Sequence, residues 1–155
     1  SGQPLKNTII AILESIFDFE VELERIHEGV IIKCNGEGPL LMFETGSTDQ
    51  GMEKKVLDQL HSHRKNRGLP ECVPAVLFIN SDSCIREVAG RIEAEVPEEL
   101  VNHAKKLNIL IVRTIDLLFL IRHLEEEPQR KDHLMTLLFS GKGWLKADSE
   151  GYRIV

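Results

Sequence analysis

The sequence predicts an α/β protein in which helices cover both faces of one central mixed β-sheet, a three-layer α/β/α arrangement. Two observations support this class. Some segments carry apolar residues at helical spacing, whereas others are short, β-branched and almost continuously apolar. The order of the segments is a helix, three strands, and then helices and strands in alternation, which is typical of a sheet whose later strands are joined by helical crossovers. We expect a single domain over residues 1–155, completed by a small C-terminal helix–hairpin addition.

The first half of the chain has the pattern of a helix, a three-stranded meander and a second helix. Asn35–Pro39 has turn chemistry, so the strands on either side of it are expected to form a hairpin. The Gly and Pro of Arg67–Pro70 are expected to end the second helix. The expected elements are a helix over Lys6–Phe17, strands over Val21–Ile26, Gly29–Lys33 and Leu40–Thr45, and a helix over Met52–Asn66.

The second half is expected to alternate between buried strands and helices. Pro97 suits the start of a helix, and the acidic residues that follow it suit the positive end of the helix dipole. Thr114 is expected to cap the next helix. The expected elements are strands over Pro74–Asn80 and Asn108–Val112, helices over Glu98–Leu107, Ile115–Leu124 and Arg130–Phe139, and a terminal hairpin over Trp144–Val155.

Length, composition and charge narrow the class of protein. The chain has 155 residues, which is enough to bury a core without the help of disulfides or metals. Hydrophobic residues make up 42% and charged residues 28%, so disordered, collagen-like and coiled-coil classes are excluded. The net charge of -6 argues against a protein that binds nucleic acid through its overall charge, but it leaves room for a local basic patch.

The cysteines and the apolar segments indicate a soluble protein of the cytoplasm. Cys34, Cys72 and Cys84 are widely separated and include no CxxC pair, so we expect neither a zinc site nor a disulfide framework. The most apolar stretch, residues 107–121, is too short to span a bilayer and contains Arg113 and Asp116. We therefore expect no membrane segment and no membrane partner.

The helix expected over Met52–Asn66 is locally basic. Lys54, Lys55, Arg64 and Lys65 are candidates for binding phosphate groups, and such contacts would be sensitive to salt. The alternative is an ordinary solvated helix face, since acidic residues are interspersed among the basic ones. His61 and His63 stand two residues apart, so on a helix they cannot both bind one metal ion.

The helix expected over Ile115–Leu124 is apolar almost all round. Complete burial is the simplest explanation of this pattern. The alternative is that one side of the helix remains uncovered and forms a surface for a homodimer or another partner.

Several local phrases, taken in their order, resemble the restriction-endonuclease-like superfamily, also called the PD-(D/E)xK nuclease fold. Glu28–Lys33 is similar to a strand that normally reads E-D-I-I-V-K, and Leu41–Ser47 is similar to L-I-E-V-K-G-S. The other matching phrases are Leu13–Glu20, Leu57–His61, Ala75–Asn80 and Ile109–Leu118. The resemblance spans most of the chain and implies a restriction-endonuclease-like fold.

The resemblance also implies a metal site, and this sequence departs from it. In such nucleases an Asp and a Glu hold Mg²⁺, and a Lys two residues after the Glu lies on the same face of the strand. Here Gly29 stands at the position of the Asp, and Phe43 and Thr45 stand at those of the Glu and the Lys. A shift by one residue restores Glu44 as a carboxylate, but Gly46 then takes the place of the Lys.

Three functional hypotheses follow. The first is a degenerate restriction-endonuclease-like domain that acts as a recognition or interaction module, with no cofactor, and with a protein, other domains of a longer chain or a nucleic acid as partner. The second is a divergent nuclease in which Glu44 binds Mg²⁺, with Glu37 and Lys54 completing the catalytic site. The third is a regulatory domain that binds a protein or a small ligand and has no nucleic-acid role.

Overall fold

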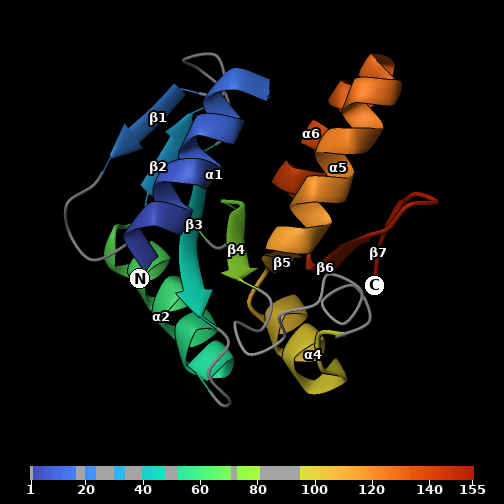
Figure 1. Cartoon of the computed structure of the whole chain (residues 1–155). Coiled ribbons are helices and arrows are strands. Elements are labelled where there is room, and N and C mark those ends of the chain that lie inside the picture. Colours follow the sequence, from blue (N-terminus) through green and yellow to red (C-terminus); the bar gives the residue numbers. More distant parts are fainter. Residues whose placement is uncertain are drawn as a thin grey trace.

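The computed structural model of the chain describes residues 2–16, 20–23, 30–33, 40–47, 52–70, 73–80 and 95–155 (Figure 1). The helices are α1 (Gly2–Ile16), α2 (Met52–Asn66), α4 (Glu98–Lys106), α5 (Thr114–Glu126) and α6 (Lys131–Ser140), with a short 3-10 helix η1 at Pro128–Arg130. The strands are β1 (Glu20–Leu23), β2 (Val30–Lys33), β3 (Leu40–Ser47), β4 (Ala75–Asn80), β5 (Ile109–Arg113), β6 (Gly143–Ala147) and β7 (Tyr152–Ile154). None of the helices in these ranges combines the length and the apolarity needed to cross a bilayer.

The strands form a mixed sheet in which their spatial order is their order along the chain, β1-β2-β3-β4-β5-β6-β7. Strands β1, β2 and β3 form an antiparallel meander. Strands β3 to β6 are parallel to one another, and β7 returns antiparallel to β6. The predicted α/β class with a mixed sheet is therefore confirmed.

Alternate residues of the central strands pack against different helices. Val76 and Phe78 of β4 belong to a cluster with residues of α1, α5 and α6, whereas Ala75 and Leu77 belong to a cluster with residues of α2 and α4. Successive side chains of a strand point to opposite faces, so the two clusters lie on opposite sides of β4. Both faces of β4 and β5 are buried, which explains why these strands are almost continuously apolar.

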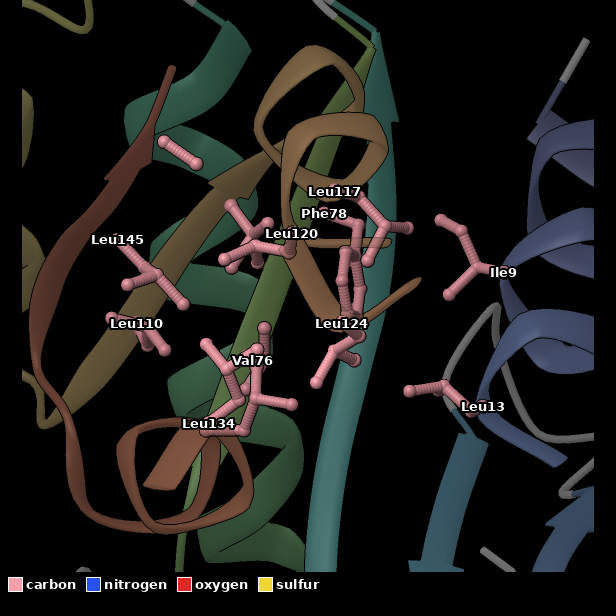
Figure 2. Packing of buried hydrophobic residues seen from close by; sticks show 13 residues of the cluster. Ile9, Leu13, Val76, Phe78, Leu110, Leu117, Leu120, Leu124, Leu134 and Leu145 are labelled. Carbon is pink, nitrogen blue, oxygen red and sulfur yellow. The ribbon is translucent and has the colours of Figure 1, made fainter. Parts of the chain in front are cut away.

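The cluster on the α1 and α5 face is the larger of the two. Figure 2 shows Ile9 and Leu13 of α1 facing Phe78 of β4 and Leu117 of α5. Leu120 of α5 is completely buried in the same cluster. Its buried members are Ile9, Leu13, Val76, Phe78, Leu110, Val112, Leu117, Leu120, Leu124, Leu134, Leu138, Leu145 and Ala147.

The structure corrects two of the sequence predictions. The terminal hairpin forms as expected, but it is not an addition beside the sheet, because β6 pairs with β5 and so extends the sheet. Thr114 does not cap α5: it is the first helical residue, and Arg113 takes the N-cap position. The reason is that Asp116 accepts a hydrogen bond from the backbone N–H of Arg113 at 3.0 Å, as the third residue of a helix does in a capping box.

Helix α2 ends in a Schellman motif. Gly68 adopts a positive φ of 70°, a conformation that glycine takes at little cost. The backbone N–H of Gly68 donates to Lys65, and that of Leu69 donates to Arg64. The glycine expected to end this helix therefore does so through a defined turn.

Truncation of Leu120 tests the packing on the α5 face. Because Leu120 is completely buried, Leu120→Ala removes apolar contacts and leaves a cavity, which is expected to cost about 2–5 kcal/mol of unfolding free energy. Leu118→Ala on the same helix is the matched control. Leu118 is 60% exposed, so its truncation is expected to change stability by less than about 0.5 kcal/mol. Equal losses in urea unfolding of the two variants would contradict this packing.

Candidate functional site

Three positions of the degenerate motif lie in β3, an inner strand of the sheet. Phe43, Glu44 and Thr45 belong to β3, where their backbones pair with Val76, Leu77 and Phe78 of β4. Phe43 also pairs with Val30, the first residue of β2. The backbone therefore brings the start of β2 beside the centre of β3. Gly29 and Glu37 lie outside the described residues, and Lys54, the remaining residue of the predicted site, is exposed near the start of α2.

The structure separates the four phosphate-binding candidates. Lys54 and Lys55 are exposed near the start of α2, and Lys65 is exposed near its end. Arg64 is only 1% exposed. The four residues therefore do not form one basic surface.

Arg64 instead joins two connections inside the protein. Its guanidinium donates to the carbonyl oxygen of Val73 at 2.9 Å, to that of Asn108 at 3.2 Å, and to that of Leu107. It also lies 3.3 Å from Nδ1 of His61, which must act as the acceptor because an arginine only donates. Val73 precedes β4, and Leu107 and Asn108 precede β5, so this one side chain fixes α2 to the starts of two neighbouring strands.

The burial of Arg64 excludes it from an exposed phosphate-binding surface. Its spacing from Leu57 and Leu60, which are both completely buried, places it on the apolar face of α2. That spacing is visible in the sequence and is a signal that Arg64 faces the core, although the basic character of the helix led to the opposite prediction.

A groove lies between α2 and α4 and has a volume of about 660 Å³. Near it, Nε2 of His103 lies 2.7 Å from Oδ1 of Asp58, which joins the two helices. The groove carries charges of both signs, as its lining includes lysines and a carboxylate. Its lining residues are Lys54, Pro97, Glu99, Leu100, Asn102, His103 and Lys106.

The most strongly hydrogen-bonded carboxylate in the described part of the chain is that of Asp116, which is completely buried. Its Oδ2 accepts from the backbone N–H of Arg113 at 3.0 Å, from Nε of Arg113 at 2.9 Å, and from Nε1 of Trp144 at 2.8 Å. Its Oδ1 accepts from Nη2 of Arg113 at 2.6 Å and from the backbone N–H of Ala147 at 3.0 Å. The carboxylate thus ties the β5–α5 junction to β6.

Trp144 packs beside this buried pair. The guanidinium of Arg113 lies 4.7 Å from the centre of the Trp144 ring, and Nζ of Lys146 lies 5.2 Å from it. Lys146 also donates to Glu95 at 2.7 Å, and this hydrogen bond holds the pKa of the Glu95 carboxyl below its usual value. The sequence showed Arg113 and Asp116 as two charges in an apolar stretch, but it did not show that they pair.

A second polar cluster joins α5, α6 and the terminal hairpin. Nε2 of His123 donates to the carbonyl oxygen of Asp148 at 2.7 Å, and Nδ1 of His133 lies 3.0 Å from the hydroxyl of Tyr152. Asp148 also accepts from the backbone N–H groups of Glu150 and Gly151, which lower the pKa of its carboxyl. The contacts of His123 with Asp148 and of His133 with Tyr152 hold the hairpin against α5 and α6.

The Ile115–Leu124 segment is mostly internal. Ile115, Leu117, Leu120 and Leu124 are buried, and Leu118 is the one large apolar side chain of this segment that is classed as exposed. A groove of about 200 Å³ lies at the end of the helix, where Ile121 and Leu124 meet Pro128. The homodimer surface predicted here stays a prediction.

No group of three or more His, Cys, Asp or Glu side chains that could hold a metal ion occurs within the described ranges. Comparisons of the chain with protein-family models, with curated proteins and with solved structures found no match.

Removal of the Asp116 carboxylate tests the cluster at the β5–α5 junction. Asp116→Ala removes the carboxylate that pairs with the buried guanidinium of Arg113 and accepts from Trp144 and Ala147, and the loss is expected to be about 3–5 kcal/mol of unfolding free energy. The emission of Trp144, the only tryptophan of the chain, is expected to shift as well because its N–H loses its acceptor. Asp132→Ala, at an exposed carboxylate of α6, is the control and should cost less than about 1 kcal/mol. Equal stability of the two variants would refute the role of the cluster.

Replacement of Arg64 distinguishes an internal role from phosphate binding. Arg64→Met keeps the apolar stem but leaves the carbonyl groups of Val73, Leu107 and Asn108 without this donor, so a loss of about 3 kcal/mol is expected. The neighbouring Lys65→Met should stay within about 0.5 kcal/mol of the unmodified protein, since Lys65 is exposed. Chemical denaturation measures both, and an Arg64→Met protein as stable as Lys65→Met would contradict the internal role.

Proposed function

We propose that this chain is a restriction-endonuclease-like domain with an incomplete metal site, which acts as a recognition or interaction module and not as a nuclease. The observation that carries the proposal is the course of the sheet. An antiparallel meander of three strands leads through a helix into parallel strands, and the segments occur in the order expected from the resemblance.

The register of β2 and β3 supports the same proposal. In such nucleases the metal-binding Asp and the Glu and Lys of the motif come from two neighbouring strands. Here the start of β2 pairs with the centre of β3, as expected if the two segments correspond to the motif strands. The residue types at those positions, Gly29, Phe43 and Thr45, do not supply the carboxylates and the amine that a metal clamp needs.

One observation favours the third hypothesis as a second candidate. The groove between α2 and α4 has a volume within the range of small-molecule sites, and it carries both lysine and carboxylate groups. These features suit a regulatory domain in which the groove binds a small polar ligand. Thermal shifts on addition of a panel of amino acids, nucleotides and sugar phosphates, with loss of the shift in Asn102→Ala, would support this candidate.

A cleavage assay tests the leading proposal. Single- and double-stranded DNA and RNA are incubated with the protein and Mg²⁺ or Mn²⁺, alongside Glu44→Ala and the control variant Glu14→Ala, in which an exposed carboxylate of α1 is removed. We expect no cleavage above background in any of the three. Cleavage by the unmodified protein and Glu14→Ala that is lost in Glu44→Ala would overturn the proposal and establish a divergent nuclease.

A further inference from the structure

The parallel strands β4, β5 and β6 begin side by side. Ala75, the first residue of β4, pairs with Ile109, the first residue of β5. Gly143, the first residue of β6, pairs with Leu110 of β5. The three connections that lead from α2, α4 and α6 into these strands therefore reach the sheet at the same edge.

Side-chain contacts hold the three connections together. Arg64, at the end of α2, donates to the carbonyl groups of Leu107 and Asn108, which follow α4. Lys105 of α4 packs so closely against Gly143 that a Cβ on this glycine would lie 2.9 Å from Cε of the lysine. Gly143 also has a φ of 104°, so both its backbone and its surroundings require glycine.

This edge is basic. Exposed cationic side chains come from the last turns of α2 and α4 and from the connections that follow α2 and α6, namely Lys65, Arg67, Lys105, Lys106 and Lys142, and together they are called the basic edge here. No Asp or Glu occurs in residues 59–70, 103–115 or 133–147, and Glu71 is the one acidic residue of the sequence that joins α2 to β4. Val155 also lies beside Gly143, and a terminal carboxyl group there would still leave a clear excess of positive charge.

Carboxylates gather at the opposite end of the same elements. Glu98 and Glu99 form the first turn of α4, and Glu95 precedes it. Asp148 and Glu150 lie in the turn that follows β6. In a chain with a net charge of -6, the acids near the starts of α4 and β7 lie beside cations such as Lys54 and Lys146, whereas the cations where the parallel strands begin have few acids near them in the sequence.

The helix dipole explains only a part of this separation. Cations at the last turns of α2 and α4 are favoured by the negative end of each dipole. Arg67 and Lys142, however, lie outside the helices, so the dipole does not account for their presence. A surface on which cations from two helix ends and two connections lie along one edge of the sheet suits the binding of an extended anion.

We propose that the basic edge binds the phosphate backbone of a nucleic acid. This inference rests on the proposed function and names the partner of the module. A small anion would need two or three donors that converge on one point, whereas a phosphate backbone meets cations that are spread along an edge. The edge includes only Lys65 of the four candidates that the sequence suggested, because Arg64 is buried and Lys54 and Lys55 lie at the other end of α2.

Charge reversal at the basic edge and at the other end of α2 tests the inference. Binding of a labelled 20-base-pair DNA duplex and of the matching RNA duplex is measured by fluorescence anisotropy in EDTA, over a range of salt concentrations. The test variant is Lys65→Glu/Lys142→Glu, and the control is Lys54→Glu/Lys55→Glu, which changes the net charge equally. Circular dichroism and the emission of Trp144 establish that both variants are folded.

The unmodified protein is expected to bind at least one duplex at low salt. The test variant should bind it at least about 10-fold more weakly and lower the slope of log K against log salt by about two, whereas the control should lose less than about 3-fold. Absence of binding by the unmodified protein, or equal losses in the two variants, would overturn the inference. The outcome is separable from that of the cleavage assay, because EDTA removes the metal ions on which cleavage depends.

Discussion

The hydrogen bonding of one buried carboxylate determines how the C-terminal half of the sheet is assembled. Asp116 has no exposure to solvent, so its charge is tolerable only because donors surround both oxygens. The donors come from Arg113 at the end of β5 and from Trp144 and Ala147 of β6. The first turn of α5 therefore has to pack against β6 before this charge can be buried.

The sequence predicted the class and the order of the elements because the periods of apolar residues are local properties. The boundaries of α2 were predicted without error, and those of α4 within one residue. The pairing of β6 with β5 was missed, since β6 carries a short pattern and joins the sheet at two residue pairs, Leu110 with Gly143 and Ile111 with Trp144. Contacts between residues that are distant in the chain leave no periodic signal in a single sequence.

The candidate site shows the same limit. Lysines near both ends of α2 were visible as a basic helix, but the sequence did not show that the helix presents its ends to different surroundings. Arg64 was counted with the exposed cations because its charge is local information, whereas its burial depends on the carbonyl groups of Val73, Leu107 and Asn108. The parallel register of β4, β5 and β6 places the basic residues that precede these strands at the same edge of the sheet. These residues include Lys65, Lys105, Lys106 and Lys142, which are distant in the sequence.

The coincidence of spatial and chain order in the sheet bears on how the protein is made. Among the described strands, each one after β1 pairs with the strand synthesised just before it, so the sheet can grow by one strand at a time as the chain leaves the ribosome. None of these strands has to be inserted between two that are already paired. Each pairing joins strands that follow one another in the chain, which keeps the entropic cost of loop closure smaller than that of a pairing between more distant segments.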